Sequence, residues 1–131
     1  MSNNSNNSNI NPQKLNTIGL FNNKVIEYMN FLDSIIDDNY IHKKIEKTIN
    51  KIYLGLVVDR LVLVNLFSTN LYKYKTNMID KDLTIFSHIE KSFFSNKIKI
   101  SDKWENISEE NKDKFWKYLK VFILLYEKIS I

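Results

Sequence analysis

Four closely spaced lysines are the side chains of this sequence best placed to bind a ligand together. They are Lys43, Lys44, Lys47 and Lys51. In a helix, Lys43, Lys47 and Lys51 recur at intervals of four residues and therefore share one face. Ammonium groups in such a row can contact successive phosphates, so the row is a candidate nucleic-acid contact. A solvated helix face has the same pattern, and both interpretations stay open.

The composition bears on how these lysines are interpreted. The chain has a formal net charge of +4, yet it contains one arginine, no alanine, and 18 residues each of lysine, asparagine and isoleucine. This bias is typical of an AT-rich genome, so the lysine content partly reflects codon usage. A dedicated phosphate-binding surface would also use arginine, because its planar guanidinium makes paired hydrogen bonds. We expect no exposed aromatic side chain among the four lysines.

Metal or acid–base chemistry would need histidines and carboxylates that converge on one place. The only histidines, His42 and His88, lie in different expected helices, and Glu46 is the one carboxylate three or four residues after His42. This pair alone is a weak metal signal. The remaining close carboxylates fall at expected helix boundaries, where aspartate caps free backbone N–H groups. These are Asp37, Asp38, Asp80 and Asp82.

Other catalytic motifs are missing from the sequence. It has no cysteine, which excludes thiolate metal sites, disulfides and cysteine nucleophiles. Its two glycines, Gly19 and Gly55, are isolated, so neither a phosphate-binding loop nor a nucleophile elbow is present. We therefore expect no catalytic residue, metal, cofactor or small-molecule substrate, with an enzyme that lacks a recognisable motif as a remaining alternative.

Apolar spacing predicts an all-α fold, a compact bundle of about five to six helices with a disordered N-terminal tail. Residues 1–19, rich in Asn and Ser, are expected to form the tail, and residues 20–131 a single helical domain. The first helix is expected from Asn22 or Asn23 to Ile36, and the second from residue 41 to about 56. Residues 54–67 fit a buried strand or a helix, and their length favours a helix that continues to about residue 75. Further helices are expected from Asp80 or Asp82, and around Ile100 and Trp104.

The last expected helix carries the clearest signals. Ser108 can cap it, and Glu109 and Glu110 favour the positive end of its dipole. Its apolar stripe, which includes Phe115 and Phe122, needs a surface to cover it. Because residues 121–125 are apolar almost all round, we expect a dimer or a larger assembly. The candidate protein interface consists of Val121, Leu124, Leu125 and Ile131.

One stretch of the chain also resembles a known group of proteins. The residues on which the resemblance rests are Trp104, then, after a short gap, the run Ser-Glu-Glu-Asn-Lys at 108–112, and the run Phe-Trp-Lys-Tyr-Leu at 115–119. In this pattern the chain resembles small uncharacterised helical proteins of large nucleocytoplasmic DNA viruses, the mimivirus-like and algal-virus groups, over residues 21–131. The resemblance implies a viral setting and supplies no site residue.

Together these observations predict a non-enzymatic viral protein that acts through protein–protein interaction, as a virion component or an accessory factor. A basic nucleic-acid-associated protein is the alternative. The first residues lack the basic and apolar regions of a signal peptide, and no run approaches the roughly 18 apolar residues of a membrane span. We therefore expect a place in the host cytoplasm or the virion, without secretion or a membrane partner.

Overall fold

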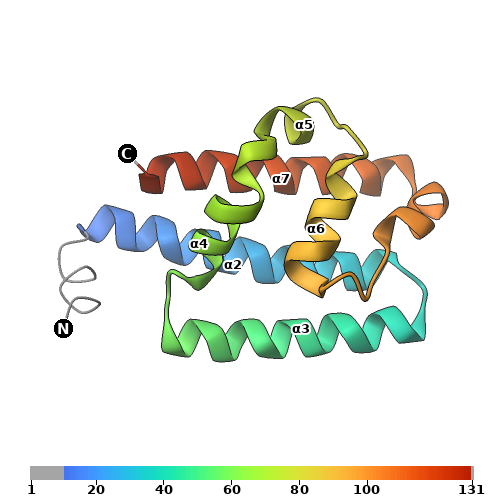
Figure 1. The fold of residues 1–131 in the computed structure, drawn as a ribbon, viewed down its shortest axis with the longest axis horizontal. Coiled ribbons are helices and arrows are strands. Elements are labelled where there is room, and N and C mark those ends of the chain that lie inside the picture. Colours follow the sequence, from blue (N-terminus) through green and yellow to red (C-terminus); the bar gives the residue numbers. More distant parts are fainter. Residues whose placement is uncertain (1–10, 131) are drawn as a thin grey trace.

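The computed structural model describes residues 11–130, and within this range the chain forms helices and connecting turns without a strand (Figure 1). The expected all-α fold is therefore confirmed. The α-helices are α2 (Pro12–Ile35), α3 (Asn39–Val58), α4 (Val62–Asn70), α5 (Lys75–Ile79), α6 (Ile85–Phe94) and α7 (Glu109–Ser130), and the 3₁₀ helices are η1 (Tyr72–Tyr74) and η2 (Ile100–Asn106).

The two long helices α2 and α7 run side by side in opposite directions at the centre of the bundle (Figure 1). Their contact is built from aromatic rings that are fully buried. Tyr28 of α2 meets Phe122 of α7 edge to face at 5.4 Å between ring centres, and Phe21 of α2 lies 5.8 Å from the same Phe122 ring. Such pairs stabilise a core beyond the area that they bury. α3 runs along the other side of α2, and α4 and α6 lie across one face of the long helices (Figure 1).

α2 begins at Pro12, which corrects the predicted start ten residues later. The side chain of Asn11 accepts a hydrogen bond from the backbone N–H of Lys14 at 2.8 Å, and proline is well suited to the first position of a helix. Ile18 is already buried in the core. Residues 12–19 of the expected tail are therefore helical, and residues 1–10 lie outside the described part of the chain.

The apolar run at 54–67 is divided between two helices and is not a strand. α3 ends at Val58, and α4 leaves it at an angle of 112°. Asp59 ends α3 and accepts a hydrogen bond from the Leu61 N–H at 2.9 Å, while the amide of Asn22 donates to the backbone oxygen of Arg60 at 3.0 Å. The single helix predicted to reach residue 75 instead ends at Asn70. Among the described residues no single helix has the length and apolar content to cross a bilayer, and α3 with α4 would meet that requirement only as a bent pair.

The predicted start of α7 after Ser108 is confirmed, whereas α6, expected from Asp80 or Asp82, begins at Ile85. The carboxylate of Asp82 accepts hydrogen bonds from the backbone N–H and the hydroxyl of Thr84, at 3.0 and 2.9 Å, at the start of α6. The hydroxyl of Ser108 accepts from the Asn111 N–H at 3.2 Å and caps α7. The Ser108 hydroxyl satisfies a backbone donor that the first turn of a helix leaves free, whereas Asp82 holds the turn before α6, which has no side-chain cap.

A second aromatic cluster joins η2 to α6 and α7. Trp104 lies 4.8 Å from Phe86 and 5.2 Å from Phe115 between ring centres, and it meets Trp116 at 5.8 Å. All four side chains are buried. The tryptophans of the C-terminal part therefore belong to the core and do not form an exposed binding patch.

Candidate functional site

Three of the four predicted lysines line one hollow on the surface. Lys44, Lys47 and Lys51 of α3 border it, and Lys97, in the loop after α6, completes it. The hollow has a volume of about 230 Å³, and no carboxylate is among the described residues that line it. Lys43 is exposed on α3 outside this lining. We call this place the lysine hollow.

The backbone turn after α6 brings Lys97 to α3. Ser95 and Asn96 adopt left-handed conformations, with φ values of 50° and 62°, and end the helix. The backbone N–H of Asn96 donates to the backbone carbonyl oxygen of Glu90 at 3.0 Å, and the backbone N–H of Lys97 donates to that of Phe94 at 2.9 Å. Sequence reasoning did not find Lys97, because it is far from the α3 lysines in the chain. Asparagine after an apolar helical run is a known signal for such a left-handed end.

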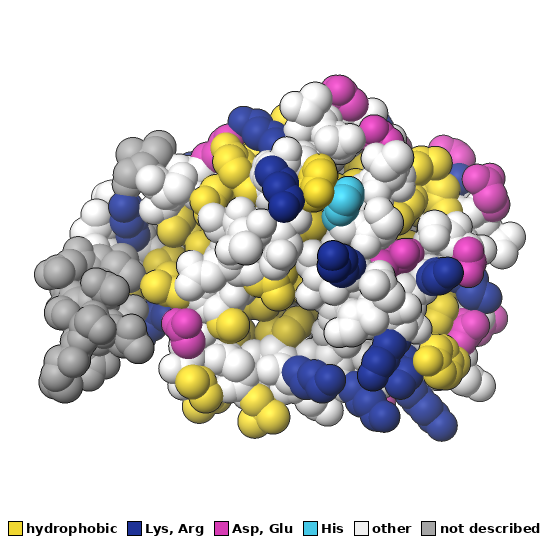
Figure 2. All heavy atoms as spheres, viewed as in Figure 1, with side chains coloured by type: hydrophobic (Ala, Val, Ile, Leu, Met, Phe, Trp, Pro, Cys, Tyr) yellow, Lys and Arg dark blue, Asp and Glu magenta, His cyan; other side chains and the backbone are white. Residues whose placement is uncertain are grey.

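An apolar hollow of about 180 Å³ continues from the lysine hollow between α3, α4 and α6. Thr48, Lys51 and Phe93 line both hollows, so the two hollows adjoin, and we call them together the α3–α6 groove. Figure 2 shows dark blue side chains gathered over the first half of α3, and a hollow with yellow side chains beside them. The apolar end is further lined by Ile52, Gly55, Val62, Leu63, Leu66 and Ser92.

The far end of α3 exposes three aliphatic side chains. Leu54 is 70% exposed, Val57 86% and Val58 88%. Their spacing of three and four residues places them on one face of the helix, and we call them the apolar patch. Yellow side chains project at this end of α3 in Figure 2. Gly55, which follows Leu54 in the chain, lines the groove, so the patch lies at the same end of α3 as the groove's apolar end but on a neighbouring face of the helix.

Exposed aromatic residues flank the four lysines on α3, outside the span from Lys43 to Lys51. Tyr40 and Tyr53 of α3 are 58% and 53% exposed. The ammonium of Lys44 lies 5.3 Å from the centre of the Tyr40 ring, within the range of a cation–π contact. The spacing of apolar residues did not reveal this, because tyrosine fits both a buried and an exposed position.

The predicted interface on α7 is only partly exposed. Leu124 is 60% exposed and lies beside Ile79 of α5, at a shallow apolar hollow of about 270 Å³. Val121 and Leu125 are half-buried, and Ile131 lies outside the described residues. Among the described residues, the three most exposed large apolar side chains lie on α3 and not on α7. Assembly through α7 stays a prediction.

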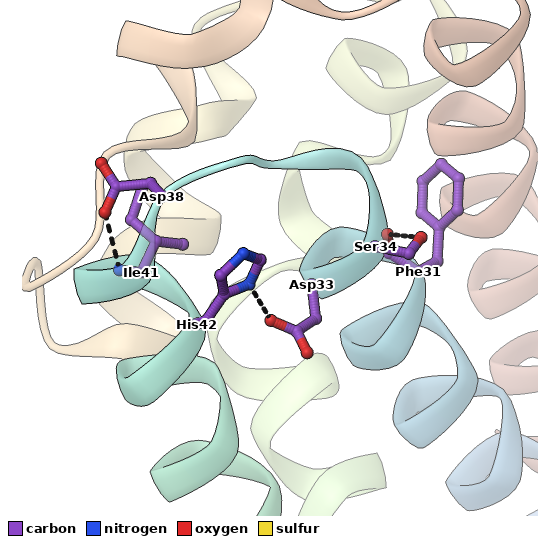
Figure 3. A network of polar contacts seen from close by, with 6 residues as sticks. All are labelled: Phe31, Asp33, Ser34, Asp38, Ile41 and His42. Atoms are coloured by element: carbon purple, nitrogen blue, oxygen red, sulfur yellow. Dashed lines mark hydrogen bonds and ion pairs between the residues drawn. The ribbon is translucent and has the colours of Figure 1, made fainter.

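His42 takes part in the turn between α2 and α3. Figure 3 shows its imidazole and the carboxylate of Asp33 pointing toward each other, with Nδ1 and Oδ1 2.5 Å apart. Beside them, Asp38 accepts from the Ile41 N–H at 3.1 Å and pairs with the ammonium of Lys103 at 3.3 Å. The Ile41 N–H, and then Lys103, hold the pKa of Asp38 below its ordinary value. These contacts fix the turn, and the predicted capping role of Asp38 is confirmed.

The second histidine is also held by its neighbours. The ring of His88 stacks on Tyr74, with ring centres 3.7 Å apart and planes inclined by 15°. Within residues 11–130, no three His, Asp or Glu side chains are grouped in a way that could hold a metal ion. What the described residues bring together is a groove with two chemically different ends.

The described residues form a small all-α bundle whose surface carries this groove. No protein-family model matches the chain, no curated protein matches it, and no solved structure matches it. Its function is therefore inferred from its own residues.

Proposed function

We propose that this protein is a non-enzymatic binding protein that contacts another protein through the apolar patch of α3. The observation that carries the proposal is the exposure of Leu54, Val57 and Val58, which is between 70% and 88% on one helix face. Burial of an aliphatic side chain of this size stabilises a complex by about 1.5–3 kcal/mol. Clustered aliphatic residues on a surface are typical of interaction sites, whereas single ones are common everywhere.

The patch sits on a rigid support, which favours binding without a large ordering cost. α3 is anchored by Ile41, Ile45 and Ile52, which are buried on its inner side. Its end is fixed by the hydrogen bonds at Asp59 and Arg60. A surface that is already ordered loses little conformational entropy when a partner binds. The resemblance of residues 104–119 to viral proteins supports the further proposal that this partner is a virion or host-cell protein.

A photo-crosslinking amino acid at Val58 tests the proposal in cells that make the protein. We expect a discrete protein adduct from this position and none from Asp113, an exposed position on α7. The double substitution Leu54→Ser and Val57→Ser should remove the adduct, because it removes the neighbouring aliphatic contacts. Equal labelling from both positions, or an adduct unaffected by the serine substitutions, would contradict the proposal.

A nucleic-acid-binding function is the second candidate, and the lysine hollow is the observation that favours it. Replacing Lys43, Lys47 and Lys51 with Glu should then abolish retention on DNA or RNA at low salt, because binding to phosphates depends on such charges. The serine substitutions in the apolar patch should leave this retention unchanged. Retention that survives the three charge reversals would exclude the second candidate.

A further inference from the structure

We propose that the α3–α6 groove binds an extended segment of a partner protein that is acidic at one end and aliphatic at the other. This inference rests on the proposed function and names the chemistry of the partner. It follows from the adjacency of the two hollows, which share Thr48, Lys51 and Phe93. A ligand that fills the groove meets ammonium groups first and aliphatic side chains next.

The charged end of the groove favours carboxylates. Lys44, Lys47, Lys51 and Lys97 surround one hollow, and none of them forms an ion pair within 4.0 Å among residues 11–130. Their like charges repel each other, and an acidic ligand would relieve this repulsion. The lysines come from two separate elements, so a ligand that reaches all four must enter the space between α3 and the loop after α6.

The apolar end favours protein over nucleic acid. Its apolar lining is aliphatic except for Phe93, with Leu63 buried and Val62 and Leu66 half-buried on α4. A phosphate chain gains nothing from such a lining, and Phe93 is a single aromatic ring, whereas single-stranded nucleic acid binds by stacking successive bases on several. Leucine or valine side chains of a protein segment can instead be buried there.

Gly55 keeps this end of the groove open. A Cβ atom at this position would meet only the Cγ1 atom of Val62, at 3.6 Å, which is an ordinary contact. The missing side chain therefore leaves room that a ligand can use. From Lys44 to Gly55 the helix rises about 16 Å, which corresponds to about five extended residues of a bound segment.

A random-peptide display selection on the full-length chain tests the inference. We expect enriched sequences with Asp or Glu at one end and Leu, Ile or Val at the other. A fluorescent synthetic copy of the most enriched peptide then provides the binding measurement, with oligo(dT) and oligo(rA) as nucleic-acid probes. Because the protein itself selects the peptide, the measurement does not depend on the identity of the natural partner.

Each end of the groove is tested by its own variant. The pair Lys47→Glu and Lys97→Glu should weaken peptide binding by about tenfold or more, and Gly55→Leu should do the same by filling the apolar end. The matched controls are the pair Lys117→Glu and Lys128→Glu on α7, and Gly19→Leu, at a helical glycine with nothing within 4 Å of a built Cβ. The controls should leave the affinity unchanged. If Gly55→Leu does not fold, Gly55→Ala replaces it.

Several outcomes would overturn the inference. In the selection, these outcomes are the absence of an enriched sequence or an enriched sequence without acidic residues. In the binding measurement, they are equal affinity for the groove variants and their controls, or tighter binding of oligo(dT) or oligo(rA) in the same groove. The adduct at Val58 separates this failure from that of the proposed function. If the adduct persists while the groove fails these tests, only the inference about the groove is wrong.

Discussion

Replacing Tyr28 with Phe should stabilise the protein, although it removes a polar group from the core. Tyr28 is fully buried, and its hydroxyl has no hydrogen-bond partner among the described residues. Burial, and then the negative charge of Glu90, raise the pKa of Tyr28 far above its ordinary value, so the hydroxyl stays protonated. The ring contacts with Phe115 and Phe122, at 5.8 and 5.4 Å, remain in the variant.

The expected gain follows from the cost of burying a hydroxyl without a partner. Leaving such a group unsatisfied costs about 1–3 kcal/mol, and part of the recovered free energy is offset by the small space that the oxygen leaves. We expect Tyr28→Phe to raise the free energy of unfolding by about 1 kcal/mol. With a urea m-value of about 2 kcal/mol/M, the unfolding midpoint should rise by about 0.5 M.

Equilibrium urea unfolding followed by far-UV circular dichroism measures this change. Tyr72→Phe is the matched control, because the Tyr72 hydroxyl donates to Oε2 of Glu127 at 2.6 Å. The control should lower the unfolding midpoint. A Tyr28→Phe variant that is destabilised as much as the control would show that the Tyr28 hydroxyl does have a partner, and would refute the reasoning.

Four further predictions concern stability. Trp116→Ala should lower the free energy of unfolding by about 3–5 kcal/mol in urea unfolding, because Trp116 is buried. A loss below about 1 kcal/mol would place the Trp116 side chain outside the core. Ser108→Ala should lower the free energy of unfolding by about 1 kcal/mol in the same assay, because it removes the cap of α7. An unchanged free energy of unfolding would show that the Ser108 hydroxyl does not cap the helix. Gly19→Ala should raise the free energy of unfolding by up to about 1 kcal/mol, and with it the melting temperature, because the helix has room for the methyl group. A lower melting temperature would contradict this. Lys75, and then Tyr72, lower the pKa of Glu127, so its contribution is present above the unfolded-state value of 4.5 and is lost as the pH falls through the lower folded-state pKa. Acid titration of stability should therefore show a shallower decline for Glu127→Gln than for the wild type.

Periodic apolar spacing predicted the helices that bury one clear face. α7 is the best example, because Phe115, Leu119 and Phe122 recur at intervals of three and four and are all buried. The start of α2 was predicted wrongly, since the Asn- and Ser-rich composition outweighs the shorter signal of Asn11 and Pro12. Composition describes the average of a segment, whereas a cap and one buried isoleucine act locally.

The break in the apolar run at 54–67 shows a second limit of sequence reasoning. Hydrophobicity predicts that such residues are buried, yet Val57 and Val58 are the most exposed of the large apolar side chains at the end of α3. Their exposure is decided by the 112° bend at Asp59 to Leu61, which turns α4 away from the direction of α3. No local pattern in the sequence fixes the angle of that bend.

The candidate site was predictable in part. Helical spacing alone places Lys44, Lys47 and Lys51 on adjacent positions of one helix. The contribution of Lys97 depends on how α6 packs on α3, and the partner of His42 depends on how α2 meets α3, so neither can be derived from local spacing. The apolar end of the groove likewise depends on the approach of α4 to α3 at Gly55, which is a tertiary contact.

The most direct test of the binding site is an NMR titration of the isotope-labelled full-length chain with the selected peptide. The account predicts that the backbone amide shifts cluster on α3 from Lys44 to Val58 and on the end of α6 up to Lys97, while the exposed face of α7 is unchanged. Shifts concentrated around Leu124 with α3 unaffected would contradict it.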